Sequence, residues 1–205
     1  MLDSISQRLK YYTHSVADSE QQNTITQAAV MLLLHGDPLD PHIILTQRAK
    51  HLSHHAGEVA FPGGMREHYD QSLLATALRE TEEEIGLASN KIKLLGMLPT
   101  DSPRLSQLSV APFMGWVESP YSLQPDSSEI AAIFNLPLKL LLDKDGYMYF
   151  ELNESKIQLP YVMYGEYKIW GFTLKVMVDM LNFVLDAQIN LRYPSQQQLQ
   201  QLMAK

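Results

Sequence analysis

The sequence predicts a mixed α/β (α+β) fold, in which a mixed β-sheet is flanked by helices. Short apolar segments bounded by turn residues predict strands, and longer segments with apolar residues at helical spacing predict helices. These elements alternate irregularly, which favours a mixed sheet over a doubly wound parallel sheet. The chain has 205 residues, 45% of them hydrophobic, which is enough for one domain with a substantial core.

The N-terminal half begins with a predicted peripheral helix in residues 2–17. Residues 28–34 and 42–47 are apolar runs separated by the turn signal His-Gly-Asp-Pro, and they predict a β-hairpin. A short strand is expected at residues 59–61, where the Pro-Gly-Gly that follows ends extended structure. The next helix is expected to run from an N-cap at Asp70 to about residue 85, with Gly86 as its C-terminal stop.

The C-terminal half contains several further predicted elements. A short helix is expected at residues 138–142, and a closing helix from about 173 to 185. Strands are expected at residues 94–98, 110–117, 131–136, 147–152, 162–164 and 167–170. We therefore expect three regions: an N-terminal peripheral helix in residues 1–25, one domain in 26–190, and a polar tail in 191–205.

Composition excludes several functional classes. With 16 basic and 23 acidic residues the net charge is −7, which argues against a nucleic-acid-binding protein. The absence of cysteine excludes disulfides, thiol nucleophiles and cysteine-ligated metals. No signal peptide is recognisable, and the longest apolar run, residues 28–34, is too short to span a bilayer. We expect a cytoplasmic protein that acts on a small molecule and contacts neither nucleic acid nor membrane.

The most informative segment is the acidic helix after the Gly-Gly turn. On a helix, Leu74, Leu78, Thr81 and Ile85 form the buried stripe. Glu80, Glu83 and Glu84 are related as i, i+3 and i+4, so they share another face. Carboxylates crowded towards the C-terminal half repel each other and the helix dipole, which invites a compensating cation. Oxygen ligands without thiolates or a histidine cluster suit Mg²⁺ or Mn²⁺.

The alternative is that these glutamates form an ordinary solvated face. The preceding Gly63-Gly64 turn favours a site, because glycine lets the backbone approach a ligand or metal closely. Arg79 could hold a neighbouring carboxylate in place or contact phosphate.

Other polar residues allow more than one interpretation. Arg48, Arg66 and Arg104 could contact phosphate or pair with local carboxylates. His51, His54, His55 and Glu58 do not have the spacing of a helical zinc site, so substrate contact or solvation is the preferred interpretation. No Walker loop or Ser–His–Asp arrangement is apparent.

Residues 64–87 resemble the Nudix box, whose pattern is G-x5-E-x7-R-E-U-x-E-E-x-G-U with U aliphatic. The second half matches at Arg79-Glu80, Glu83-Glu84 and Gly86-Leu87, with Thr81 at an aliphatic position. In the first half, Asp70 replaces the glutamate, and eight residues rather than seven separate it from Arg79. That departure is similar to the coenzyme A pyrophosphatase branch of the superfamily.

A second stretch resembles the signature that precedes the box in that branch, L-T-x-R-[SA]-x3-R-x3-G-x3-F-P-G-G. It begins at Leu45, passes through Arg48 and Gly57, and ends at Gly64, while Ser53 stands where the second arginine is expected. The resemblance covers about residues 26–186. It implies a Nudix-type α/β/α sandwich and a homodimer.

The resemblance also implies roles for individual residues. Glu80, Glu83 and Glu84 would be the metal ligands, assisted by the carbonyl of Gly63, and Arg79 would orient a carboxylate. The base that activates water would be Glu83 or Glu84, or else Glu129 from a later loop. Arg48, Gly64 and Arg66 are the residues expected to contact substrate.

The implied activity is divalent-metal-dependent hydrolysis of a pyrophosphate bond. Coenzyme A is the first substrate candidate, giving 3′,5′-phosphorylated adenosine and 4′-phosphopantetheine. The alternatives are ADP-ribose, NADH or a nucleoside triphosphate, since the loss of an arginine at Ser53 weakens the coenzyme A assignment. A Nudix-like domain that only binds a nucleotide is a further alternative, against which the three retained glutamates argue.

Overall fold

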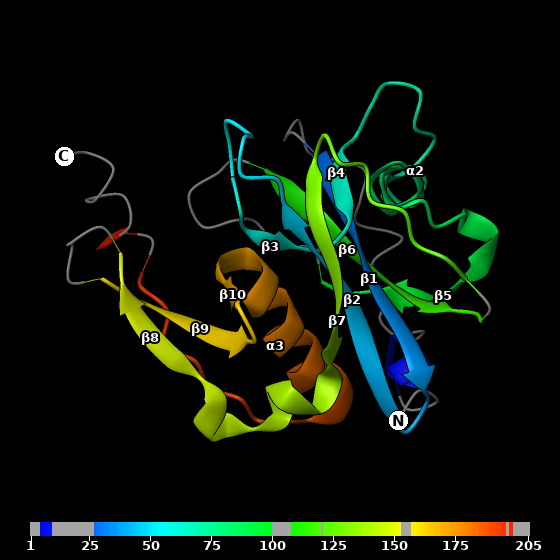
Figure 1. Cartoon of the computed structure of the whole chain (residues 1–205). Helices are drawn as coiled ribbons and strands as arrows, with labels where there is room; N and C mark the ends of the chain where they lie inside the picture. Colours follow the sequence, from blue (N-terminus) through cyan, green and yellow to red (C-terminus); the bar gives the residue numbers. More distant parts are fainter. Residues whose placement is uncertain are drawn as a thin grey trace.

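The computed structural model has a seven-stranded mixed β-sheet with α2 on one face and α3 on the other (Figure 1). It describes residues 5–9, 27–99, 108–119, 121–152, 157–195 and 197–198. The expected mixed α/β fold with helices on both faces of the sheet is therefore confirmed. Arg104 and most of the expected helix at residues 2–17 lie outside the described residues, although residues 5–9 are helical.

The central sheet is built on β1 (Gln27–Asp37), which has three neighbours. It pairs antiparallel with β2 (Asp40–Arg48) and β4 (Gly63–Met65), and parallel with β6 (Ser109–Val117). The remaining strands are β3 (Val59–Ala60) and β7 (Ile130–Pro137), which pair with β2, and β5 (Ile92–Met97), which pairs with β6. The expected hairpin is thus confirmed. The Pro-Gly-Gly turn was wrongly expected to end extended structure, since Gly63 and Gly64 form β4 against β1.

The apolar run in β1 is continuous because both faces of the strand are buried. Leu32 and Leu34 belong to the core on the α3 side of the sheet, whereas Met31 and Leu33 belong to the core on the α2 side. A strand buried on both faces needs apolar residues at successive positions rather than alternating ones.

Helix α2 (Leu73–Ile85) begins two residues later than the sequence predicts. Ser72 is its N-cap and accepts a hydrogen bond from Ala75 N, so the expected cap at Asp70 is wrong. Gly86 ends the helix with a left-handed φ of 69°, as expected. The buried side is centred on Ala77, Thr81 and Ile85, while Leu74 and Leu78 are only partly buried.

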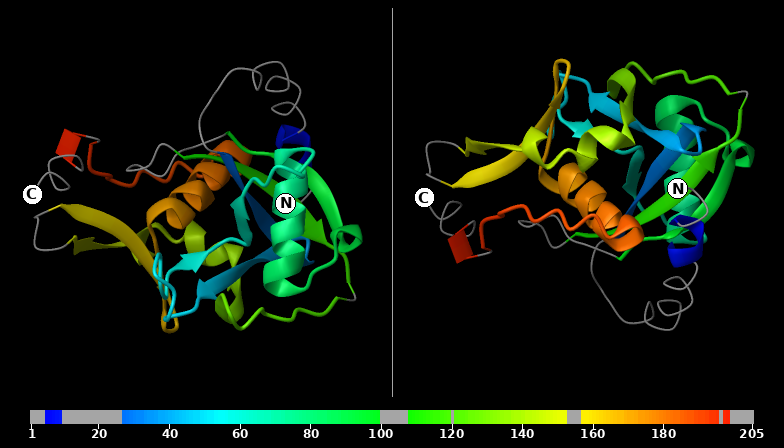
Figure 2. Two further views of the ribbon diagram at one scale, coloured as in Figure 1. Left: turned by 90° about the horizontal axis from the view of Figure 1, so that it is seen from above. Right: turned by 90° about the horizontal axis from the view of Figure 1, so that it is seen from below.

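Helix α3 (Gly171–Leu185) lies between the central sheet and a small antiparallel sheet (Figure 2). The small sheet has the order β10 (Tyr167–Trp170), β9 (Gln158–Tyr164), β8 (Met148–Glu151). Because α3 is covered on more than one side, eight of its fifteen residues are buried. The short 3₁₀ helices are Ser89–Lys91, Leu138–Leu142 and Lys144–Gly146. In the described part of the chain, no helix is long and apolar enough to cross a membrane.

Candidate active site

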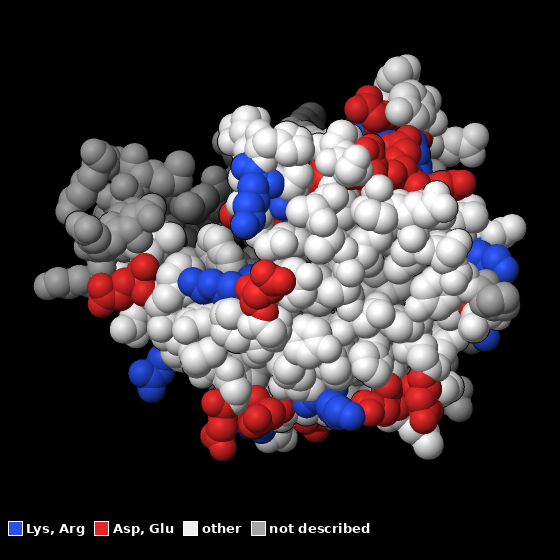
Figure 3. Space-filling view, in the orientation of Figure 1, with Lys and Arg blue, Asp and Glu red and all other residues white. Residues whose placement is uncertain are grey.

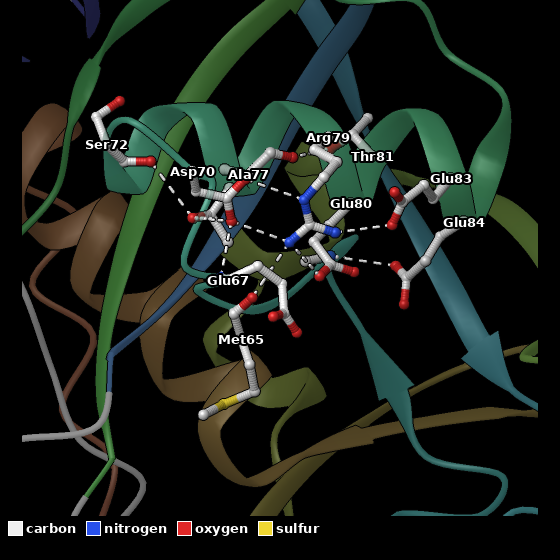
Figure 4. Close-up of polar contacts among 12 residues, drawn as sticks. Met65, Glu67, Asp70, Ser72, Ala77, Arg79, Glu80, Thr81, Glu83 and Glu84 are labelled. Carbon is white, nitrogen blue, oxygen red and sulfur yellow. Dashed lines mark hydrogen bonds and ion pairs between the residues drawn. The ribbon is translucent and has the colours of Figure 1, made fainter.

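The carboxylates of α2 form an acidic surface on the side of the helix next to β4. Acidic side chains gather over α2 with basic atoms beside them (Figure 3). Glu80, Glu83 and Glu84 project along the same side of the helix (Figure 4). That side faces β4, which contacts α2 closely and brings the Gly-Gly segment next to the carboxylates. The shared face that the helical spacing predicts is therefore present.

Asp70 anchors this surface from the loop before α2. Its carboxylate accepts hydrogen bonds from Thr76 Oγ1 at 2.9 Å and from Glu67 N at 2.9 Å. Arg79 Nε donates to Asp70 Oδ1 at 3.0 Å, and Arg79 Nη2 donates to Asp70 Oδ2 at 3.1 Å. The guanidinium contact lowers the pKa of Asp70 most strongly, and Asp70 in turn raises the pKa of Arg79. Asp70 is thus an ionised carboxylate that holds Arg79 in place, and this ion pair explains why Asp70 is buried.

Arg79 links the anchor to the helix carboxylates. Its Nη1 donates to Glu83 at 2.8 Å, and its Nη2 lies 2.9 Å from Glu80 and 3.2 Å from the carbonyl oxygen of Met65. Every nitrogen of the guanidinium therefore has a short contact, which fixes its plane. Arg79 orients two carboxylates at once, where the sequence predicts only that it would hold one.

Glu84 is the buried member of the group, with a side-chain exposure of 7%. Its Oε2 accepts a hydrogen bond from Gly63 N at 3.1 Å. The pKa of Glu84 is raised to about 7, chiefly by burial and also by the negative charges of Glu80 and Glu129, while the Gly63 hydrogen bond and Arg48 oppose the rise. Burial also raises the pKa of Glu80, which Arg79 opposes. Glu84 therefore lacks full compensation of its charge.

The two glycines of β4 are required by close contacts. Gly63 has φ of 153°, and a Cβ there would lie 2.4 Å from the carbonyl oxygen of Ala29. A Cβ on Gly64 would lie 2.5 Å from the carboxylate carbon of Glu80. Gly64 thus lets Glu80 of α2 lie directly against the backbone of β4, whereas Gly63 lets β4 lie close to β1.

A second arginine and a loop carboxylate complete the site. Arg48, the last residue of β2, places Nη1 3.7 Å from Glu84 and Nη2 3.8 Å from Glu129. Glu129 immediately precedes β7, and its carbonyl oxygen accepts a hydrogen bond from Ala49 N at 2.7 Å. Two segments far apart in sequence therefore bring a cation and a further carboxylate to the exposed end of Glu84.

The remaining candidates lie differently. Arg66 donates to Gln27 Oε1 and to the carbonyl oxygen of Asp70, so these contacts hold the loop before α2 rather than the carboxylates. Ser53 is exposed in the loop between β2 and β3, and Glu82 is exposed on α2. In the loop between β2 and β3, His55 pairs with Glu58, and His51 contacts the carbonyl oxygen of Ser128.

The donor chemistry of the site fits a hard divalent cation. Carboxylate oxygens from Glu80, Glu83, Glu84 and Glu129 are the ligands that Mg²⁺ and Mn²⁺ prefer, and the partly compensated charge of Glu84 would be neutralised by such an ion. Within the described residues, however, no three acidic or histidine side chains converge as a ready-made metal site. Arg79 and Arg48 form ion pairs with these carboxylates instead, so these ion pairs must rearrange before a metal cation can bind.

Comparison with known proteins places this geometry in a family. Residues 25–150 match the family model of the NUDIX domain. An uncharacterized Nudix hydrolase, NudL, from Photorhabdus laumondii is 36% identical over 152 residues, which cover 73% of this chain and 80% of that protein. The chain belongs to the Nudix family. NudL from Salmonella paratyphi B is 35% identical over 159 residues, covering 75% of this chain and 80% of that protein.

The fold also agrees with a solved Nudix structure. A MutT/nudix family protein from Enterococcus faecalis superposes with a TM-score of 0.55, covering 87% of this chain and 70% of that one at 16% sequence identity. At this identity the likeness concerns the fold alone. The Nudix box of this chain, Gly64 to Leu87, comprises most of β4, the loop anchored by Asp70, and α2.

Proposed function

We propose that this Nudix protein is a divalent-metal-dependent hydrolase of a pyrophosphate bond, with coenzyme A as the first candidate substrate. The observation that supports this most strongly is the placement of two carboxylates against β4, Glu80 at Gly64 and Glu84 at Gly63, the second of them buried with incompletely balanced charge. A protein that only bound a nucleotide would have no need for a destabilising cluster of this kind.

In this proposal Glu80, Glu83 and Glu84 hold the cation, and the carbonyl of Gly63 assists them. Mg²⁺ or Mn²⁺ bound there neutralises charge on the diphosphate and makes its phosphorus more electrophilic. Arg79 keeps Glu80 and Glu83 in position through its anchor on Asp70. The missing side chain of Gly64 leaves room for the carboxylate of Glu80 against β4, and the backbone of Gly64 would contact substrate beside it. Arg66 would contact substrate from the preceding loop.

Two groups of carboxylates are candidates for accepting the proton of the attacking water. The first is Glu83 or Glu84 on α2, beside the proposed metal position. The second is Glu129, which is half-exposed and approaches from another loop. If Glu129 is the base, Glu129→Gln should lower kcat strongly without weakening Mn²⁺ binding. An unchanged kcat would assign the role to α2.

Coenzyme A is favoured by the signature from Leu45 to Gly64, which resembles that of the coenzyme A pyrophosphatases. Ser53 in place of the second arginine weakens the coenzyme A assignment, so ADP-ribose, NADH and a nucleoside triphosphate, which also contain a pyrophosphate bond, are the alternatives. The test is a panel of these substrates in Mg²⁺ and in Mn²⁺ with products identified by mass. Release of 4′-phosphopantetheine, fastest from coenzyme A, supports the first candidate. Turnover of the others alone retains the chemistry and changes the substrate.

A further inference from the structure

Arg48 is held at the site by its backbone rather than by its side chain. Its N–H donates to the carbonyl oxygen of Glu58 at 2.9 Å, and its carbonyl oxygen accepts from Gly57 N at 3.2 Å. The β2–β7 pairing shifts register between Gln47 and Arg48. Irregularities of this kind redirect a side chain out of the regular pleat, and here the side chain reaches the gap between Glu84 and Glu129.

The two arginines of the site differ in how tightly they are bound. Arg79 makes contacts of 2.8 to 3.2 Å through all three guanidinium nitrogens. Arg48 approaches its carboxylates only to 3.7 and 3.8 Å, outside hydrogen-bonding range, and its buried Nε has no hydrogen-bond partner among the described residues. An arginine whose role was purely structural would be expected to make short, bidentate contacts like those of Arg79. Arg48 therefore holds its guanidinium beside two carboxylates of the site without a hydrogen bond to either.

The position of Arg48 also conflicts with a bound cation. Glu84 uses Oε2 to accept from Gly63 N, so Oε1 is the oxygen with both lone pairs open to a metal ion, and Oε1 is the atom that Arg48 approaches. Two positive charges cannot share that oxygen without strong repulsion. Glu129, the other partner, is half-exposed and can follow or release the guanidinium without burying a charge.

From these contacts we infer that Arg48 is an exchangeable cation of the active site. It balances Glu84 and Glu129 in the metal-free enzyme, leaves Glu84 when a divalent ion binds there, and then donates to the diphosphate of the substrate. The inference rests on the proposed function. In this exchange, metal binding releases Arg48 from Glu84. Arg48 can therefore bind the diphosphate only when the metal is present.

The exchange predicts opposite effects of one substitution on two ligands. In Arg48→Gln, Mn²⁺ alone should bind about tenfold more tightly, the size expected for removing one like charge a few ångström away in a partly hydrated site. The non-hydrolysable diphosphate α,β-methylene-ADP, measured in saturating Mn²⁺, should bind about tenfold more weakly because a charged donor is lost. An arginine that only contacted phosphate would leave Mn²⁺ affinity unchanged, and one that only stabilised the site would weaken both ligands.

The experiment measures free Mn²⁺ by electron paramagnetic resonance at pH 8.5, followed by calorimetric titration with α,β-methylene-ADP. Arg48→Met, which keeps the aliphatic stem, is a second variant in case glutamine is poorly accommodated, and circular dichroism checks folding of both. Lys139→Gln makes the same change in net charge at an exposed lysine paired with Asp40, outside the site, and should alter neither affinity.

Opposite shifts in the Arg48 variants support the exchange. Unchanged or weaker Mn²⁺ binding in folded Arg48→Gln and Arg48→Met, with normal binding by the natural protein, overturns the exchange and leaves the proposed function standing. Failure of the natural protein to bind Mn²⁺ overturns both.

Discussion

Replacing Glu84 by glutamine should stabilise the metal-free protein while abolishing its activity. The carboxylate is buried against β4, and its pKa rises from an ordinary 4.5 to about 7, chiefly through burial. The folded state therefore prefers the protonated form, and ionisation at higher pH destabilises it. The penalty begins as pH rises above about 4.5 and is complete above about pH 7. Glutamine is neutral at every pH and can still accept the hydrogen bond from Gly63 N.

The size of the effect follows from the pKa difference. At about 1.36 kcal/mol for each pKa unit, the gain above pH 7 has an upper limit of about 3 kcal/mol. For a chain of this size that corresponds to at most about 6–12 °C in Tm. Urea unfolding in EDTA should show Glu84→Gln to be more stable than the natural protein at pH 8.5 and nearly equal to it at pH 5. If Glu84→Gln were equally or less stable than the natural protein at pH 8.5, the ionised Glu84 carboxylate would not destabilise the metal-free fold.

The other predictions concern the supports of the site and the core. Gly64→Ala should leave Tm within a few degrees but reduce turnover at least tenfold, because the flexible carboxylate of Glu80 must move away from a Cβ placed 2.5 Å from it; unchanged kcat would contradict this. Asp70→Asn should lower Tm at pH 7, since the pKa of Asp70 is depressed by Arg79 and its stabilisation is present above the unfolded pKa. The difference in Tm between the natural protein and Asp70→Asn should become smaller as pH falls below about 4. A Tm difference that stays constant from pH 7 to pH 3 would argue against an ion pair between Asp70 and Arg79. Leu34→Ala, at a fully buried position of β1, should lower the free energy of unfolding by about 2–5 kcal/mol in urea titrations, and a loss below 1 kcal/mol would show that the core can collapse around it.

The parts of the fold that depend on local patterns could be predicted from the sequence. The apolar run at residues 28–34 and the turn after it specify the β1–β2 hairpin, and Gly86 specifies the end of α2. The i, i+3, i+4 spacing of Glu80, Glu83 and Glu84 places them on one side of the helix before any tertiary contact is considered.

The missed features all depend on contacts between distant segments. Asp70 has the residue type and position of an N-cap, but its carboxylate binds Arg79 nine residues away, and Ser72 caps the helix instead. The strand character of Gly63 and Gly64 comes from pairing with β1 and has no local signal. Arg48 is separated from Glu84 and Glu129 along the chain, so only the folded sheet shows that the three meet.

Metal-dependent hydrolysis is tested by comparing the natural protein with Glu83→Gln on coenzyme A and ADP-ribose, in Mn²⁺ and in EDTA, with products identified by mass. Glu83 is exposed on α2, so its replacement should leave the fold intact, which an unchanged circular dichroism spectrum checks. The natural protein should split a diphosphate into two phosphorylated products only in Mn²⁺, and Glu83→Gln should lose this activity at least a hundredfold. Hydrolysis in EDTA, or an undiminished rate in folded Glu83→Gln, would contradict this prediction.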